Sequence, residues 1–223
     1  MSSLFNTLFE RGGPVILILI GMSLIATTII SAKLWQFAAT RVGRHGMAKQ
    51  AVDEWISGNR SHAYDLVYGD SSPVSTVLAH AMRGVSLNKR DGEVREDVTR
   101  VATQTLHGLQ SYIRALDTVA QTAPLLGLFG TVLGMIETFG ALETAGASVD
   151  PSQLAGGIWV ALLTTAVGLA VAMPCGVLAS WFEGQLENER TVMETMLTGF
   201  FTEFATDEHA GLPRDRQTIS SGV

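Results

Sequence analysis

The chain has 223 residues, of which 47% are hydrophobic and 16% are charged, and its formal net charge is −6. A chain of this size can form one sizeable domain or a small membrane protein, and these totals favour the second without excluding the first. The sequence shows no basic patch that would indicate nucleic-acid binding. Because Cys175 is the single cysteine, an intrachain disulfide is excluded.

Three stretches carry no charged residue, namely 12–32, 118–136 and 151–182. Each is near or above the roughly 20 apolar residues that cross about 30 Å of hydrocarbon as a helix. They predict an all-α integral membrane protein with three transmembrane helices. The first stretch is expected to be a retained anchor and not a cleaved signal peptide, because it is too long for the apolar region of a signal peptide and lacks a net positive charge before it.

The basic residues near the spans predict the orientation, because they stay on the cytoplasmic side. Lys33, Arg41, Arg44 and Lys49 follow the first span, whereas residues 141–157 contain no lysine or arginine. We therefore expect the N-terminus outside and the C-terminus in the cytoplasm. The expected segments are an outer N-terminus (1–11), a first span (12–34), a cytoplasmic helical domain (35–117), a second span (118–141), an outer hairpin (142–150), a third span (151–182), a cytoplasmic helix (183–209) and a disordered tail (210–223).

Apolar stripes at three-and-four spacing predict that both later spans continue as cytoplasmic helices. One stripe includes Val94, Val98 and Leu109 and is expected to run without interruption into the second span; another follows the third span and includes Met193 and Phe200. Asp150 is the expected N-cap of the third helix, with Pro151 at its first position and its end near Thr206. A break is predicted at the sequence YGDSSPVS, where Ser72 and Pro73 supply turn chemistry.

No catalytic or metal-binding pattern is visible in the sequence. The histidines lie apart from one another, without metal-ligand spacing beside a carboxylate, and are expected to be ordinary surface or core residues. The sequence also lacks a nucleophile elbow and a phosphate-binding glycine loop. We therefore expect no enzymatic activity, no cofactor and no bound metal. The histidines are His45, His62, His80, His107 and His209.

The second and third spans each carry a helix face of small residues. On the second span it comprises Pro124, Gly127, Thr131, Gly134 and Thr138. On the third span it comprises Ala161, Thr165, Gly168, Ala172, Gly176 and Ala179.

Two interpretations of these faces remain open. Small residues let helix backbones approach closely in lipid, and Gly130 with Gly134 forms a GxxxG motif. Alternatively, such faces gathered in an oligomeric ring would line a lumen with small residues and hydroxyls. Pro174, deep in the third span, either shapes that lumen or is a tolerated membrane proline. Glu137, toward the outer end of the second span, marks either a pore mouth or the end of a helix.

The stretch TAPLLGLFGTVLGMIETF, followed by GGIWVALLTTAVGLAVAMP, closely resembles the MotA/TolQ/ExbB proton-channel family. Three spans with a large cytoplasmic segment are most like its ExbB/TolQ branch, and SPVSTVLAHAMRG is also similar to a family feature. The resemblance implies a homopentameric ring in the bacterial inner membrane, with periplasm on its outer side. Within the ring would sit an ExbD- or TolR-like single-span partner with a membrane aspartate, and the work of this molecular motor would pass to a TonB- or TolA-like protein.

The resemblance also implies roles for particular residues. Thr131 and Thr165 stand where the family places pore hydroxyls that face the aspartate of the partner, and Val160 stands where many members carry a glutamate. Hydroxyls suit this task because they donate to a carboxylate and accept from a carboxylic acid without ionising. Without a third-span carboxylate, the proton would be shuttled by the partner, with Glu137 as an outer antechamber. The expected ion path comprises Thr131, Thr165, Gly127, Gly134, Thr138, Thr164, Ala161 and Glu137, with Pro124 and Pro174 shaping the helices.

Three functions are consistent with this sequence. The first is a proton-channel and stator subunit that couples the proton gradient to outer-membrane transport, or in a TolQ-like role to envelope integrity. The second is a membrane scaffold that clusters a single-span partner without conducting ions, which Val160 favours. The third is a flagellar-type or gliding-type motor subunit.

Overall fold

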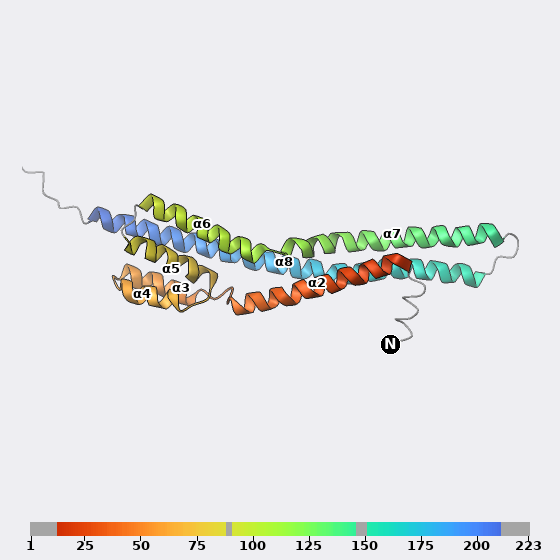
Figure 1. Ribbon diagram of the computed structural model, residues 1–223, viewed down its shortest axis with the longest axis horizontal. Coiled ribbons are helices and arrows are strands. Elements are labelled where there is room, and N and C mark those ends of the chain that lie inside the picture. The colour runs from red at the N-terminus through yellow and green to blue at the C-terminus, as the bar shows by residue number, and fades with distance from the viewer. Residues whose placement is uncertain (1–12, 88–90, 146–150, 211–223) are drawn as a thin grey trace, which may run out of the picture. The chain divides into compact units, whose positions relative to one another are not determined.

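The computed structural model describes residues 13–87, 91–145 and 151–210, and every regular element in these ranges is an α-helix (Figure 1). The expected outer N-terminus 1–11, the Asp150 cap, most of the hairpin and nearly all of the expected tail lie outside the described residues. The helices are α2 (Gly13–Ala39), α3 (Gly46–Ile56), α4 (Arg60–Tyr68), α5 (Pro73–Ser86), α6 (Asp91–Gln110), α7 (Ile113–Ala145) and α8 (Pro151–Ala210).

The chain divides into two compact units. One, here called the membrane unit, consists of Met1–Ala38 and Gln110–Gly184, and the other, here called the helical subdomain, consists of Ala39–Leu109 and Gln185–Val223. Helix α8 contributes its first part to the membrane unit and its last part to the helical subdomain.

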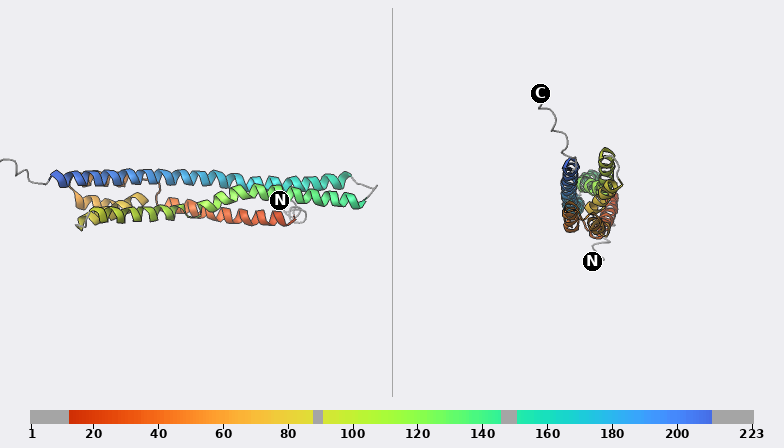
Figure 2. Two further views of the ribbon diagram at one scale, coloured as in Figure 1. Left: turned by 90° about the horizontal axis from the view of Figure 1, so that it is seen from above. Right: turned by 90° about the vertical axis from the view of Figure 1, so that its left-hand side faces the viewer.

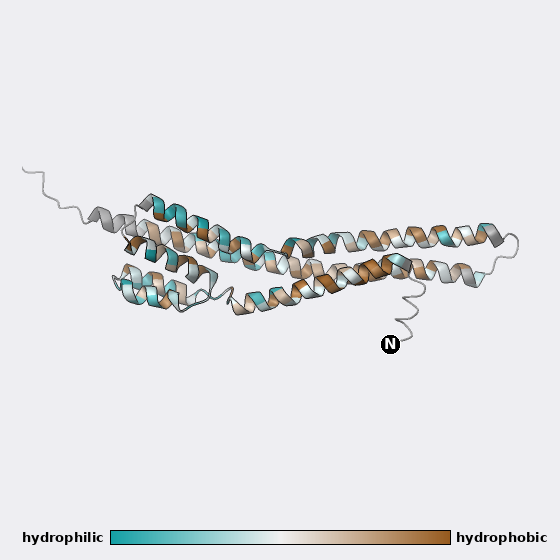
Figure 3. Cartoon of the chain, viewed as in Figure 1, coloured by the Kyte–Doolittle hydropathy of each residue, from teal (hydrophilic) through white to brown (hydrophobic). Residues whose placement is uncertain are grey.

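The membrane unit contains the apolar helices of the chain. Three described stretches are long and apolar enough to cross a membrane: Pro14–Ala39, a part of Gly92–Glu143 and a part of Leu154–Thr202. Figure 3 shows hydrophobic residues along α2 and along parts of α7 and α8, whereas hydrophilic residues gather on α3, α4 and α6. The three membrane-length helices predicted from charge-free stretches are therefore present.

Helix α2 packs against α7 and α8 through a small cluster of buried side chains. Val15 and Leu19 of α2 meet Ala123 of α7 and Ala172 of α8. The views in Figures 1 and 2 agree that α7 runs beside the first part of α8. The two small-residue helices are thus neighbours within one chain.

Aromatic rings join the end of α2 to α8. The Phe37 ring lies 5.1 Å from that of Phe182 and 6.4 Å from that of Trp181, measured between centroids. The side chains of Trp181 and of Trp35 are exposed. These ring contacts bring the last turns of α2 against this part of α8.

The helical subdomain has a conventional core of larger apolar side chains. Helices α3, α4, α5 and α6 and the last part of α8 all contribute to it. The stripes predicted from the sequence are confirmed, since Val94, Val98, Met193 and Phe200 are each at most 2% exposed. Rings of Trp55 and Phe200 pack 5.3 Å apart.

The predicted break before α5 is confirmed. Helix α4 ends at Tyr68, and α5 begins at Pro73 with Ser72 as its N-cap. The Ser72 hydroxyl accepts a hydrogen bond from the backbone N–H of Ser75 at 3.2 Å, which satisfies one of the free N–H groups at the start of the helix.

The expected uninterrupted helix into the second span is wrong. Helix α6 ends at Gln110 and α7 begins at Ile113, because Tyr112 adopts a left-handed backbone conformation with φ of 65°. Such a conformation ends a right-handed helix and is costly for a residue with a Cβ atom. By contrast α8 runs over 60 residues and continues through Pro174, as α7 continues through Pro124.

Candidate ion path along two small-residue helices

Helices α7 and α8 approach at backbone distance in the membrane unit. A Cβ atom placed on Gly127 would lie 2.9 Å from the Thr164 carbonyl oxygen, and one on Gly168 would lie 2.6 Å from the Ala123 carbonyl oxygen. Real Cβ atoms essentially never come so close to other heavy atoms. Glycine is therefore required at both positions for this packing, as expected where helices meet in lipid.

The same contact continues toward the C-terminal end of α7 and the N-terminal end of α8. A Cβ atom on Gly134 would lie 3.0 Å from that of Ala161, and one on Gly130 would lie 2.6 Å from the Thr164 hydroxyl. Near the end of the contact, Gly157 faces Thr138 even more closely. The close-packing interpretation is thereby confirmed for these glycines, and Gly157 is a member that the sequence argument missed although it continues the spacing of Ala161 and Gly168.

Two adjacent hydroxyls of α8 share one carbonyl of α7. Thr164 Oγ1 lies 3.1 Å and Thr165 Oγ1 lies 3.2 Å from the Gly127 oxygen. Thr164 also lies 2.7 Å from the Ala161 oxygen, and its side chain is almost completely buried. Since a hydroxyl has one proton, the shorter distance favours donation from Thr164 to Ala161.

Thr165 differs from its neighbour in burial and in bonding. Its residue is only half-buried, and the 3.2 Å distance to Gly127 is the one hydrogen bond recorded for its hydroxyl among the described residues. The bond is at the long end of the usual range. Thr165 can therefore turn toward an incoming group at lower cost than Thr164, which sits between two carbonyls.

Thr131 lies away from the glycines with which it shares a predicted face. Its hydroxyl donates to the Leu128 carbonyl at 2.6 Å, and its side chain lines a surface groove of α7. The other lining residues are Val132, Met135, Ile136, Phe139, Gly140 and Glu143.

The predicted path residues thus separate into two groups. Gly127, Gly134, Thr138, Ala161 and Thr164 lie in the contact between α7 and α8, whereas Thr131 and Thr165 remain partly accessible and Glu137 is exposed. Val160 is half-buried beside Ala161. Their role in lining a pore stays a prediction, because one pair of helices in contact encloses no lumen.

The apolar parts of these helices hold no acidic or basic side chain over residues 118–136 and 154–182. Within the ranges that the structure describes, no group of three or more His, Cys, Asp or Glu residues could hold a metal ion. Proton transfer along α7 and α8 alone would therefore depend on hydroxyls, backbone groups and water.

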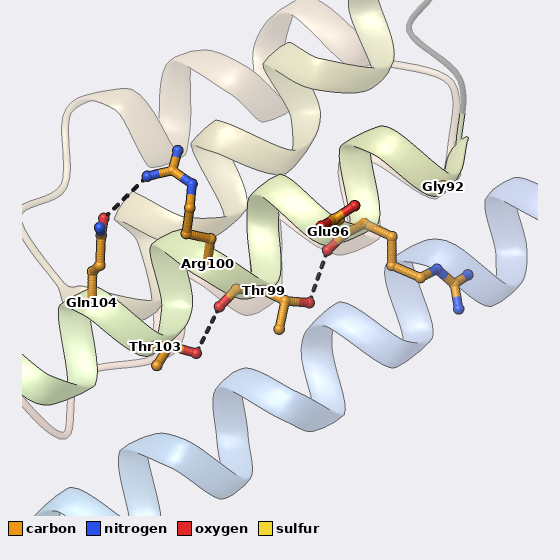
Figure 4. Close-up of a pocket in the computed structure, with 7 residues that line it drawn as sticks. Gly92, Glu96, Thr99, Arg100, Thr103 and Gln104 are labelled. Atoms are coloured by element: carbon orange, nitrogen blue, oxygen red, sulfur yellow. Dashed lines mark hydrogen bonds between the residues drawn. The ribbon is translucent and has the colours of Figure 1, made fainter.

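The helical subdomain carries a surface groove along α6 that does not resemble a catalytic site. Figure 4 shows Arg100 directed toward Gln104, and the hydroxyls of Thr99 and Thr103 directed toward the α6 backbone. All of the lining residues belong to this one helix. The hydroxyls of Thr99 and Thr103 and the paired side chains of Arg100 and Gln104 bond within this helix and do not converge on a common point.

Two carboxyl groups of the helical subdomain have lowered pKa values. Hydrogen bonds from His80 and Arg100 lower the pKa of Asp97 to about 2. Burial raises the pKa of Asp70, but hydrogen bonds from Ser75 and Ser72 and the charge of Arg41 outweigh it, so that the net shift is downward. The Asp97 bond to His80 joins α6 to α5, and the Asp70 contacts are with the start of α5 and with the linker between α2 and α3, which indicates a structural role.

Comparison with known proteins gives consistent matches. The family described as the MotA/TolQ/ExbB proton channel family matches residues 70–195. Biopolymer transport protein exbB1 of Vibrio cholerae is 30% identical over 160 residues, covering 68% of this chain and 67% of that protein. The Tol-Pal system protein TolQ of Pseudomonas aeruginosa is 28% identical over 217 residues, covering 90% of this chain and 89% of that protein.

An archaeal relative is similar over a shorter region. A protein of Methanothermobacter thermautotrophicus, named as an ExbB homolog, is 37% identical over 118 residues. The match covers 53% of this chain and 40% of the archaeal protein, so the chain spans less than half the length of that relative.

Proposed function

Because the chain belongs to the MotA/TolQ/ExbB proton channel family, we propose that it is the proton-conducting stator subunit of an energy-transducing complex in the bacterial inner membrane. It is a membrane subunit of the ExbB/TolQ type with three apolar helices. The observation that carries the proposal is the pair of small-residue helices, whose accessible hydroxyls, Thr131 and Thr165, lie in otherwise apolar segments.

The proposed channel requires several copies of the chain. Helices α7 and α8 pack together too closely for a lumen between them, so the path must lie between subunits or between the ring and a partner. We infer a homo-oligomer, pentameric by family resemblance, around an ExbD- or TolR-like single-span protein. A TonB- or TolA-like protein would receive the work.

In this proposal the Thr165 hydroxyl forms hydrogen bonds with the proton carrier, a carboxyl group in the membrane helix of the partner. A carboxylate on the partner can accept from Thr165 once that hydroxyl turns from Gly127, and a protonated carboxyl can donate to the same oxygen. Val160 adds no second carboxylate, so like-charge repulsion from this position does not raise the pKa of the carrier. Thr164 is buried against Gly130 in the contact between α7 and α8 and does not contact the carrier.

The proposed orientation places the N-terminus in the periplasm and the C-terminus in the cytoplasm. It rests on the lysine and arginine residues that follow α2 and on their absence from residues 141–157. Contact of Phe37 with Trp181 and Phe182 is consistent with one shared interface for those ends of α2 and α8.

A TolQ-like role in envelope integrity is the second candidate. The observation that favours it is the match to TolQ of Pseudomonas aeruginosa over 89% of that protein, compared with 67% for exbB1 of Vibrio cholerae. Deletion of the gene distinguishes the two roles. Loss of outer-membrane transport would support the ExbB-like role, and leakage of periplasmic proteins with normal transport would support the TolQ-like role.

Proton flux tests the channel itself. We would reconstitute the chain with its single-span partner in liposomes and compare the wild type with Thr165→Val, Thr164→Val and an Asp→Asn change in the membrane helix of the partner. Flux should need both proteins and should fall at least tenfold for Thr165→Val and for the partner variant.

Thr164→Val serves as the matched control on the adjacent residue. It should lower the free energy of unfolding by about 1 kcal/mol, the typical net contribution of a hydrogen bond. Proton flux per assembled complex should stay within about twofold of the wild-type value. Absence of flux in an assembled wild-type complex would replace the channel by a scaffold that clusters its partner. Equal loss of flux in both threonine variants would contradict the role assigned to Thr165.

A further inference from the structure

One carboxylate of the helical subdomain is completely buried. Glu189 of α8 is 0% exposed, although its surroundings in the sequence include Glu183, Glu187 and Arg190. Its Oε1 atom accepts a hydrogen bond from the backbone N–H of Gly43 and lies 2.8 Å from Nε2 of His45. Its Oε2 atom has no hydrogen-bond partner among the residues that the structure describes.

Burial of a carboxylate is expensive unless hydrogen bonds replace its water. The Oε2 atom has no such replacement among the described residues, so part of this cost is left uncompensated. Core packing alone therefore does not account for a glutamate here. Both bonds of Glu189 go to a single segment, the linker between α2 and α3.

That linker, residues 40–45, has an unusual backbone. Arg41 and Gly43 both adopt left-handed conformations, with φ of 49° and 86°. A side chain at Gly43 would be strained at this φ whatever the space around it. Arg41 also lies 3.7 Å from Asp70, so the linker is held at a second point. These two attachments keep a costly turn in place.

The bonds of Glu189 connect two segments that each follow a membrane-length helix. The linker directly follows α2, the first membrane-length helix, and Glu189 lies on the part of α8 that follows the third. We call Gly43, His45 and Glu189 the clasp. The clasp joins the segments that leave the first and third spans, which are far apart in sequence.

We propose that Glu189 is a positioning residue that fastens the linker after the first membrane helix to the extension of the third, so that both segments move together when the channel works. The proposal rests on the proposed channel function for its consequence, but the fastening itself depends only on the clasp. Of the two arginines in the linker, Arg41 faces Asp70 and Arg44 is exposed.

Glu189→Leu separates fastening from core packing. Leucine fills the buried position but accepts no hydrogen bond, and it leaves the Gly43 N–H and the His45 ring without that acceptor. The variant should therefore stay folded with a melting temperature at or below that of the wild type. Glu189→Gln keeps an acceptor for both bonds and should behave as the wild type. Glu194→Leu is the matched control, because Glu194 lies on the same helix and is exposed.

Hydrogen exchange of residues 40–45 should be measured in the complete complex in lipid nanodiscs. Exchange of the Gly43 amide should be at least tenfold faster in Glu189→Leu, and unchanged in Glu189→Gln and Glu194→Leu. Equal exchange in Glu189→Leu and wild type would overturn the clasp. Should Glu189→Leu fail to fold, His45→Ala replaces it, since it removes one bond and should accelerate exchange by a smaller factor.

Proton flux and growth that depends on the complex supply the functional readout. Glu189→Leu should retain flux while losing the growth, and Glu189→Gln should restore the growth. If Glu189→Leu supports growth as well as the wild type, the proposed coupling is wrong. A wild-type complex without flux would refute the channel and the coupled movement, whereas the exchange measurement would still decide whether the linker is fastened.

Discussion

The membrane unit and the helical subdomain are both built from helices, but the helices inside each unit pack in different ways. In the helical subdomain, large side chains such as Leu78, Met82 and Phe200 fill the space between helices. In the membrane unit, Gly127 and Gly168 have no side chain, so the backbones of α7 and α8 come into contact. Large residues such as Leu125 are exposed on the outside of the unit.

The difference follows from the solvent of each unit. In water, burial of apolar area stabilises the folded state by about 25 cal/mol per Å², so large side chains belong inside. In lipid, a leucine that faces the acyl chains costs no free energy of solvation. Close backbone packing and hydrogen bonds between helices must therefore supply the stability. Thr165 provides such a bond, from its hydroxyl on α8 to the Gly127 carbonyl of α7.

The largest effect is expected from shortening a core leucine of the helical subdomain. Leu78→Ala removes a side chain that is 0% exposed and should lower the free energy of unfolding by about 2–5 kcal/mol. Leu125→Ala in α7, where the side chain is 64% exposed, should change it little. Denaturation of both variants in the same lipid or detergent measures this difference. Equal losses of unfolding free energy would show that the two units do not differ in how large side chains stabilise them.

A smaller loss is expected from lengthening a glycine in the membrane unit. Gly168→Ala places a methyl group against the Ala123 carbonyl and should cost about 1–3 kcal/mol through overpacking. Gly156→Ala in the same helix meets nothing within 4 Å and should be neutral or stabilising. Thermal unfolding monitored by tryptophan fluorescence compares the stability of the two variants. If Gly168→Ala were as stable as the wild type, the backbones of α7 and α8 would be able to move apart without cost.

The smallest effect is the pH dependence that Asp70 contributes to the helical subdomain. Its pKa is lowered in the folded state, so its stabilisation is complete above the ordinary aspartate pKa of about 3.9 and is lost as the pH falls through the folded pKa. Asp70→Asn should therefore lower the melting temperature at pH 7 and approach the wild type near pH 3. The exposed Asp65→Asn is the control, and a difference that grows on acidification would have the wrong sign.

Much of the fold follows from patterns that are local in sequence. Charge-free stretches located α2, α7 and the first part of α8, and the Ser72–Pro73 pair marked the start of α5. The break at Tyr112 could not be found this way, because neither glycine nor proline marks it. A tyrosine carries no residue-type preference for the left-handed conformation, so its presence at position 112 gave no signal.

The candidate site was predictable as a set of small residues but not as an arrangement. Thr164 and Thr165 are chemically equivalent in the sequence, and only the position of α7 makes one buried and the other accessible. Glu189 could not be distinguished from Glu187, because its partners, Gly43 and His45, are 146 and 144 residues away. Contacts over such separations leave no local pattern.

The contact between Gly168 and the Ala123 carbonyl also limits how the protein can change. A methyl group added at Gly130 would strike the Thr164 side chain, and a smaller residue at position 164 could relieve that clash as a second-site suppressor. A methyl group added at Gly168 strikes a main-chain oxygen, which every residue carries. No compensating substitution can remove that atom, so Gly168 should stay invariant among descendants while position 130 can vary together with 164.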